Sequence, residues 1–171
     1  MKGARPYPRA LARKYAGKRW WLGKSVVDFF YQTCDMYPDK EALVEGETRL
    51  TYSQLKEKTM RASLALLELG MGKGDCVLFH VPNWAENIWI YFALQTIGAI
   101  PVMCMPRDGQ KELETFCELT QAVAWIGAAQ LGRTESVPLL KGVKEMFPSL
   151  KHVIMARDEA ATGTVSLPEL I

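Results

Sequence analysis

Cysteine and histidine are scarce in this sequence, and their spacing excludes several kinds of metal and disulfide chemistry. There are four cysteines and two histidines among 171 residues. No two cysteines form a CxxC pair, so neither a zinc site nor a disulfide framework is indicated. The cysteines are Cys34, Cys76, Cys104 and Cys117, and three of them lie inside apolar segments. We therefore expect buried free thiols, as in a protein of the reducing cytoplasm.

Long apolar runs are also missing. No stretch of about 18 apolar residues is present, so the sequence predicts no membrane span. Hydrophobic residues make up 49% of the chain and charged residues 23%, which is the balance of an ordinary soluble globular protein. A chain of 171 residues fits one compact domain, or part of a larger one, and is long enough to bury a core.

Acidic residues are absent from residues 1–24, which we call the lead-in. This segment carries +8, whereas the rest of the chain, with 13 basic and 19 acidic residues, carries −6. A transit peptide or a nucleic-acid-binding arm would explain such a start. Transit peptides are rich in serine, however, and none occurs before Ser25; a secretory signal would need an apolar segment after the charges. Aromatic and basic residues interleave only here, so a nucleic-acid partner is weakly supported.

We instead interpret the lead-in as a docking segment. Its charges would be solvated while four aromatic side chains pack on the domain, namely Tyr7, Tyr15, Trp20 and Trp21. The rest of the chain, residues 25–171, is then a separate α/β unit.

That unit alternates between helical and strand patterns. Helices are predicted from Ser25 to Met36, Thr51 to Leu69, Asn83 to Ile97, Lys111 to Gln121 and Val137 to Phe147, with another opening at Leu167. Strands are predicted at Asp75–Val81, Ile100–Met105, Ala122–Gly127 and Lys151–Met155, and a hairpin at 42–51. Continuous apolar strands separated by helices indicate an α/β fold: a mainly parallel, doubly wound sheet flanked by helices, with a small β-hairpin.

Ligands of such sheets bind beyond the carboxyl ends of the strands, so the residues there are candidates for a site. His80 ends a strand and is able to act as a base or to contact a ligand, although a packed, hydrogen-bonded histidine is the commoner case. Asn83 is either a ligand group or, as we favour, a helix cap. Arg107 lies on a loop and either contacts an anion or belongs to a solvated turn.

Neither glycine-rich segment has the order of a phosphate-binding loop. Residues 70–75 (GMGKGD) follow a helix and precede a strand, which is the reverse of the required order. Residues 127–132 follow a strand but lack both the GxGxxG spacing and a GK[ST] ending. From the residues alone, no complete catalytic set can be assembled.

Three segments, in order and spacing, resemble the AMP-dependent synthetase and ligase family of adenylate-forming enzymes. They are PDKEALVEGETRLTYSQLKEKTMRASLALLELGMGKGD at 38–75, VPNWAENIWIYFALQTIGAIPVMCMP at 81–106, and KELETFCELTQAVAWI at 111–126. Each motif is weak alone, but their succession is specific. The lead-in and the loop around Arg107 look most like the branch that acts on aryl acids such as dihydroxybenzoate, and medium-chain acyl ligases share many of these features.

The resemblance implies a two-step reaction. ATP and a small carboxylic acid, in this branch an aryl acid, give an acyl-adenylate and pyrophosphate, with Mg²⁺ and basic side chains offsetting phosphate charge. The acyl group then passes to the thiol of CoA or of a carrier-protein pantetheine. Arg133 lies in a region that approaches CoA in some relatives, and a homodimer is one form that the assembly can take.

The sequence also departs from the family pattern. The family's Ser/Thr/Gly-rich phosphate loop with its lysine is absent, because Thr162-Gly163-Thr164 is too short and no PKG follows it. No family catalytic residue falls on this chain, so we expect it to be the N-terminal part of a larger ligase domain, inactive without the rest of the ligase chain. The alternative is a non-catalytic α/β binding module whose basic arm captures an anionic partner.

Overall fold

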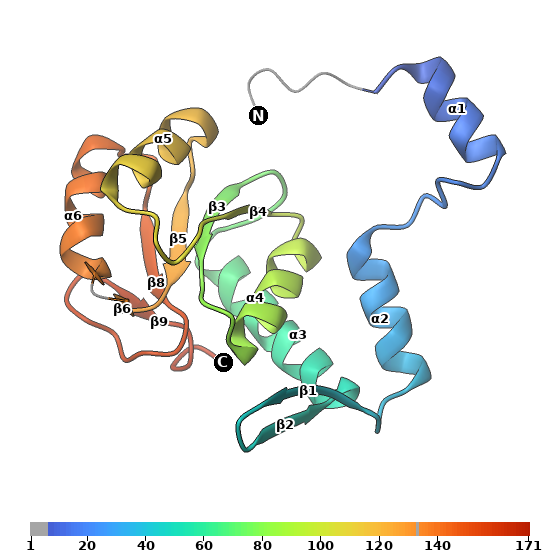
Figure 1. Ribbon diagram of the computed structural model, residues 1–171, viewed down its shortest axis with the longest axis horizontal. Coiled ribbons are helices and arrows are strands. Elements are labelled where there is room, and N and C mark those ends of the chain that lie inside the picture. Colours follow the sequence, from blue (N-terminus) through green and yellow to red (C-terminus); the bar gives the residue numbers. More distant parts are fainter. Residues whose placement is uncertain (1–6, 133) are drawn as a thin grey trace.

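A computed structural model describes residues 7–132 and 134–171 of the chain, and its centre is a five-stranded sheet (Figure 1). The strands are β3 (Cys76–His80), β4 (Ile100–Met103), β5 (Ala124–Gly127), β8 (His152–Met155) and β9 (Val165–Ser166). Their spatial order is β4-β3-β5-β8-β9, and every neighbouring pair is parallel. The predicted parallel sheet is therefore confirmed.

Helices cover both faces of this sheet. The helices α2 (Val26–Met36), α3 (Tyr52–Glu68) and α4 (Ala85–Thr96) pack on one face, and α5 (Gln110–Thr120) and α6 (Ser136–Met146) pack on the other. Alternation along β3 supplies both cores: Val77 and Phe79 join the first, and Cys76 and Leu78 join the second. Burial on both faces explains why the strands read as continuous apolar runs, and the arrangement is the predicted doubly wound fold.

Local signals set the helix boundaries. Ser25 and Asp28 form a reciprocal capping box at the start of α2, and Thr51 and Gln54 form another at the start of α3. The chain leaves α3 at Gly70, whose φ of 83° is open to glycine at little cost. Between α2 and α3 lies the expected hairpin of β1 (Glu41–Glu45) and β2 (Thr48–Thr51).

The prediction of a helix opening at Leu167 is wrong: residues 168–170 form a single turn, in which the Leu170 N–H donates to the Leu167 carbonyl at 3.0 Å. Just before it, Val165 and Ser166 form β9 beside β8, and the Leu167 N–H extends that pairing by donating to the Met155 carbonyl at 2.9 Å. The Leu167 side chain is fully buried in the core, which favours the extended path over a last short helix. A second short pairing that the sequence did not reveal joins β6 (Gln130–Leu131) to β7 (Thr134–Glu135).

The lead-in contains a helix, α1 (Arg9–Gly17), that was not predicted and that lies apart from the sheet (Figure 1). None of its residues is buried. The expectation that the four lead-in aromatics pack on the domain is not met, because their rings pack on one another and Trp20 and Trp21 are 64% and 45% exposed. This arrangement could not be predicted, because the sequence pattern indicates apolar contact but not the partner of that contact.

All four cysteines are buried, as expected. Burial raises the pKa of Cys104 to about 12 and that of Cys117 to about 11, so both stay protonated and unreactive at neutral pH. Among the helices of the described residues, none is long and apolar enough to cross a membrane.

Candidate functional site

The carboxyl ends of the parallel strands meet at one edge of the sheet, which we call the carboxyl edge (residues 80–86, 103–109, 127–129 and 155–158). This is where an α/β sheet binds ligands. Two glutamates from outside the sheet strands, Glu45 of the hairpin and Glu86 of α4, also reach it. Its chemistry depends on which polar groups there are free and which are already paired.

His80 is buried and is held by two partners. The indole N–H of Trp125 donates to His80 Nδ1 at 3.3 Å, and His80 Nε2 lies 2.6 Å from the Met105 carbonyl oxygen. Because an indole can only donate, Nδ1 must be unprotonated, and Nε2 then carries the proton and donates it to Met105. The histidine thus links β3, β5 and the loop after β4.

Burial lowers the pKa of His80, and the Met105 carbonyl and the nearby Asp108 carboxylate oppose that shift only in part. The ring is 2% exposed and both of its nitrogens are engaged. It is therefore placed to hold the loop carrying Arg107 rather than to exchange protons with a ligand.

Gly127 beside His80 is required by packing. A Cβ there would lie 2.3 Å from the Trp125 ring and 2.8 Å from the His80 carbonyl oxygen, well inside normal contact distances. The glycine at the end of β5 therefore allows the backbone and the Trp125 ring to approach each other.

Asn83 and Arg107 are both exposed, and no contact joins them to each other or to His80 among the described residues. The prediction that Asn83 caps α4 is wrong. The N-cap residue is Trp84, and its side chain makes no capping hydrogen bond. Arg107 lies in the turn closed by Asp108, whose carboxylate accepts from the Met105 N–H at 2.7 Å. Arg133, the candidate near CoA, lies outside the described residues.

The carboxylate that replaces Asn83 as the cap of α4 comes from the hairpin. Glu45 Oε2 accepts from the Ala85 N–H at 2.8 Å, although the two residues are 40 positions apart. A negative charge at a helix N-terminus is favoured by the helix dipole. The start of α4 is thus an anion site that the chain fills with its own side chain.

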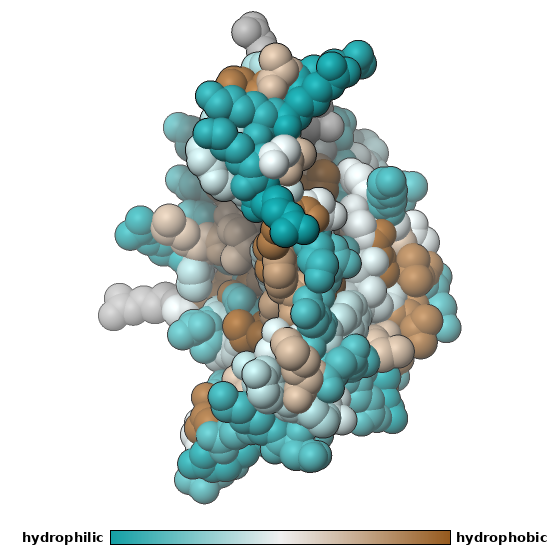
Figure 2. Space-filling model, turned by 90° about the vertical axis from the view of Figure 1, so that its right-hand side faces the viewer, coloured by the Kyte–Doolittle hydropathy of each residue, from teal (hydrophilic) through white to brown (hydrophobic). Residues whose placement is uncertain are grey.

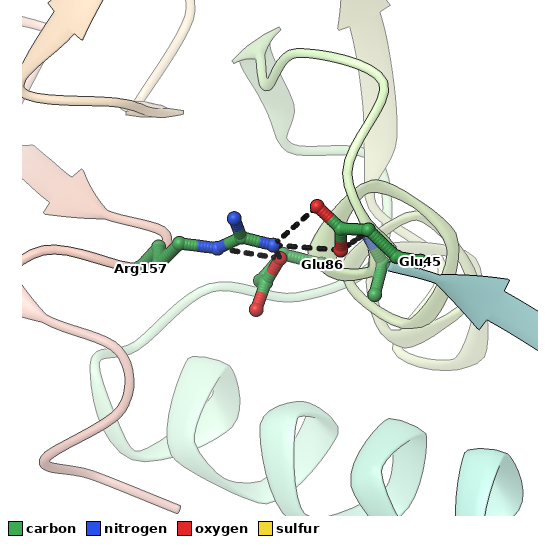
Figure 3. Close-up of polar contacts among 4 residues, drawn as sticks. Glu45, Glu86 and Arg157 are labelled. Carbon is green, nitrogen blue, oxygen red and sulfur yellow. Dashed lines mark hydrogen bonds and ion pairs between the residues drawn. The ribbon is translucent and has the colours of Figure 1, made fainter. Parts of the chain in front are cut away.

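Arg157 joins this cap to the end of β8, as Figure 3 shows. Its Nη2 donates to both carboxylate oxygens of Glu45, at 2.8 and 2.9 Å, and its Nε donates to Glu86 at 3.0 Å. The guanidinium lies 4.3 Å from the centroid of the Trp84 ring. One arginine therefore holds the hairpin, the start of α4 and the loop after β8 together.

The pKa values in this cluster shift in the directions that its hydrogen bonds dictate. The bond to Glu86 is the largest cause of the raised pKa of Arg157, followed by an opposing effect of burial and then by the bond to Glu45. The Ala85 N–H and then the Arg157 guanidinium lower the pKa of Glu45. Both shifts favour the charged forms of Arg157 and Glu45.

The described residues contain no cluster of metal-binding side chains. No group of three or more His, Cys, Asp or Glu among them is arranged to hold a metal. The carboxylates of the carboxyl edge are engaged: Glu45 and Glu86 with Arg157, Asp108 with Met105, and Asp158 with the Ala129 N–H at 2.7 Å. The start of α4 is likewise occupied, by Glu45, so the polar groups named here are already paired within the chain.

Sequence reasoning placed Arg157 and Asp158 in a strand-end range but did not single them out. Arg157 was detectable only by its position directly after an apolar strand. Glu45 carried no signal, because a turn glutamate of a hairpin looks like any solvated charge. Their partnership spans 112 positions and becomes visible only in the fold.

Comparison with known proteins finds a protein family and individual relatives that this chain resembles. Residues 30–168 match the family described as AMP-binding enzyme. The chain is 30% identical over 156 residues to 2,3-dihydroxybenzoate-AMP ligase of Bacillus subtilis, covering 91% of this chain and 29% of that protein. It is also 30% identical over 163 residues to salicyl-AMP ligase / salicyl-S-ArCP synthetase of Mycobacterium tuberculosis, covering 92% of this chain and 29% of that protein.

Solved structures also resemble this chain in fold. The apo structure of Mycobacterium smegmatis MbtA superposes with a TM-score of 0.90 and 30% identity, covering 98% of this chain and 31% of that one. The anthranilate CoA ligase AuaEII, at 22% identity and a TM-score of 0.73, shares the fold. This chain thus spans less than a third of the length of these relatives. With the family match extending over most of its residues, the chain belongs to the AMP-binding enzyme family.

Proposed function

We propose that this chain is the N-terminal α/β part of an AMP-forming ligase that activates a small aryl carboxylic acid. The observation that carries the proposal is the family match over residues 30–168, supported by relatives whose names specify dihydroxybenzoate and salicylate. The division into a lead-in of residues 1–24 and an α/β subdomain of residues 25–171 belongs to the proposal, as does a cytoplasmic location.

In the proposed reaction, ATP and the acid form an acyl-adenylate, and the acyl group then passes to a thiol of CoA or of a carrier protein. A carboxylate is a poor electrophile, and adenylation gives it a good leaving group. Mg²⁺ would offset phosphate charge during the first step. Since no cluster of metal-binding side chains occurs among the described residues, the proposal assigns the Mg²⁺ contacts to the rest of the ligase chain.

This chain's own contribution is positional. Arg157 holds the hairpin and α4 at the carboxyl edge, and His80 holds the loop that presents Arg107. Arg107 and Asn83 are exposed there and are available to an anionic or polar group of a ligand. Arg133, by the family resemblance, is proposed to lie near the thiol acceptor.

The test is acid-dependent exchange of pyrophosphate into ATP, with salicylate and 2,3-dihydroxybenzoate as acids. The purified 171-residue chain is expected to show none. A chimera is then made in which this chain replaces the matched N-terminal part of the M. smegmatis protein, and exchange is expected to return. Exchange by the chain alone would disprove its dependence on the remainder, and a folded chimera without exchange would count against the ligase assignment.

A second function is favoured by one observation, the exposure of the basic and aromatic lead-in. On this alternative the chain is a non-catalytic α/β module whose lead-in captures an anionic partner. Salt-sensitive association of the isolated chain with nucleic acid or anionic lipid, lost when residues 1–24 are deleted, would support it. Binding that survives the deletion would speak against it.

A further inference from the structure

The lead-in presents a cluster of apolar rings beside basic side chains, away from either core. Tyr15 lies at its centre, with ring centroids 5.9 Å from Tyr7, 5.5 Å from Trp20 and 5.4 Å from Trp21. Leu22 beside them is 62% exposed. We call these five residues the lead-in surface. In Figure 2 apolar side chains lie between hydrophilic ones at the top of the view, where α1 lies.

The helix α1 is not expected to be stable in isolation. It is nine residues long and none of its residues is buried, and isolated helices shorter than about 12 residues are marginal in water. Its larger apolar side chains, Leu11 and Tyr15, fall on one side, Arg9 and Arg13 fall on the other, and Lys14 flanks the apolar side. An amphipathic helix of this length gains its stability from a surface that its apolar side contacts.

The comparison with the M. smegmatis structure shows how much of a relative lies outside the part that this chain matches. A superposition at a TM-score of 0.90 covers 98% of this chain, so most of the lead-in falls inside the matched part. That superposition uses only 31% of the M. smegmatis chain. Because α1 buries none of its residues within the matched part, the unmatched remainder of such a ligase is the surface left for it to contact.

We infer that the lead-in surface is a docking site for the portion of an AMP-binding ligase that lies outside the region matched by this chain. The inference rests on the proposed function. The partner face should contain an apolar groove for Trp20 and Trp21, because exposed tryptophans at the centre of a patch are the usual anchors of an interface. It should be bordered by acidic side chains, because the lead-in carries +8 and no acidic residue.

The rate of tryptic cleavage in the lead-in tests this inference, because trypsin cleaves after lysine and arginine and the lead-in contains several of both. In the isolated chain, cleavage after Arg13, Lys14 or Lys18 should be rapid, because exposed and weakly held helices open readily. In the chimera described above it should be at least tenfold slower. Cleavage after Lys73, in the exposed turn before β3, serves as the internal reference.

A double variant of the chimera, Trp20→Ala with Trp21→Ala, should restore rapid cleavage of the lead-in, and Leu119→Ala should not. Leu119 is the matched control because it is 67% exposed on α5, far from the lead-in in the sequence. Raising the salt concentration should speed lead-in cleavage relative to Lys73, because salt screens the acidic contacts. Neither tryptophan is buried, so the double variant keeps the sheet intact.

Equal cleavage of the lead-in in the isolated chain and the chimera would overturn the inference, even if the chimera exchanges pyrophosphate. Protection without exchange would instead sustain the docking site and remove the proposed function. A chimera that does not unfold cooperatively also counts against the docking site, because a surface complementary to the lead-in should accept it. Protection of the isolated chain by vesicles of phosphatidylglycerol, with none in the chimera, would reassign the surface to a membrane.

Discussion

Two tryptophans of this chain each have a cation over the ring, in very different surroundings. At the carboxyl edge, the Arg157 guanidinium lies 4.3 Å from the Trp84 centroid and is also bonded to Glu45 and Glu86. In the lead-in, the Lys18 ammonium lies 4.7 Å from the Trp20 centroid, and that ring is 64% exposed. One cation–tryptophan pair is thus embedded in a network of ion pairs, whereas the ring of the other is open to solvent.

The difference separates two ways in which this chain uses charge. At the carboxyl edge the acidic and basic groups satisfy one another, so that Arg157 joins three segments that are distant in the sequence. In the lead-in the positive charges have no acidic neighbour within the segment, and the aromatic rings contact mainly one another. The charged groups of the carboxyl edge are therefore paired within the chain, whereas those of the lead-in are available to a partner.

The largest loss of stability is expected from a substitution in the tightly packed part of the carboxyl edge beside Trp125. Gly127→Ala should lower the free energy of unfolding by about 2–3 kcal/mol, because the new Cβ would meet the Trp125 ring and the His80 carbonyl at distances that force a shift. Urea unfolding followed by circular dichroism measures it. Gly17→Ala in α1 is the control, since a Cβ there meets nothing within 4 Å. Equal midpoints for the two variants would contradict the difference between the regions.

A smaller loss is expected on removing the arginine network. Arg157→Ala should cost about 1–2 kcal/mol, since it leaves two carboxylates facing each other and uncovers Trp84, although 40% exposure of the arginine side chain moderates the cost. Arg49→Ala removes a simpler pair with Glu41 whose side chains are 63% and 50% exposed, and should cost under about 0.5 kcal/mol. If both variants unfold at the same urea concentration, Arg157 contributes no more than a surface ion pair.

These two sites also mark how far the sequence alone could lead. The parallel sheet, its two helical layers and the capping boxes at Ser25 and Thr51 were predictable, because each depends on residues close together in the chain. Glu45 as the cap of α4 was not, because the competing local candidate, Asn83, has the right chemistry for a cap. Only the approach of the hairpin to α4 decides between them.

The same limit applies to β9 and the lead-in. Val165 and Ser166 form too short a strand to leave a periodic pattern, and the neighbouring β8 determines their conformation. The aromatic residues of the lead-in were predicted to pack, but a sequence does not state against what. The local signals of a single helix or strand can be predicted from the sequence. Contacts between residues 40 or 112 positions apart are known only once the fold is known.

A pH-dependent effect should distinguish His80 from the solvated charges of the lead-in. Burial lowers the pKa of His80 in the folded chain, so the unfolded chain binds a proton first as the pH falls below about 6.5. The stability that neutral His80 contributes is present above that pH and is lost as the pH falls through the folded pKa. Unfolding measured between pH 7.5 and 5.5 should show a steeper loss in the unmodified chain than in His80→Gln.

The glutamine in that variant can still accept from Trp125 and donate to Met105, so the comparison isolates titration from hydrogen bonding. The Asp108 carboxylate, which raises the His80 pKa in part, is present in both proteins. Burial and two nearby lysines also lower the pKa of His152, which titrates in both proteins and therefore cancels in the comparison. Identical slopes would show that His80 does not change its protonation in this range.

The smallest effect on stability is expected from the most prominent side chains on the surface. Trp21→Ala should change the free energy of unfolding of the isolated chain by less than about 0.5 kcal/mol, because the ring is 45% exposed and its contacts lie in the lead-in. A tryptophan buried in a core costs about 3–5 kcal/mol when truncated, so the two outcomes are well separated. A large loss would place Trp21 in the structural core of the isolated chain, and the lead-in would then have its partner within residues 25–171. A negligible loss leaves an exposed aromatic cluster whose stabilising contacts must come from another surface.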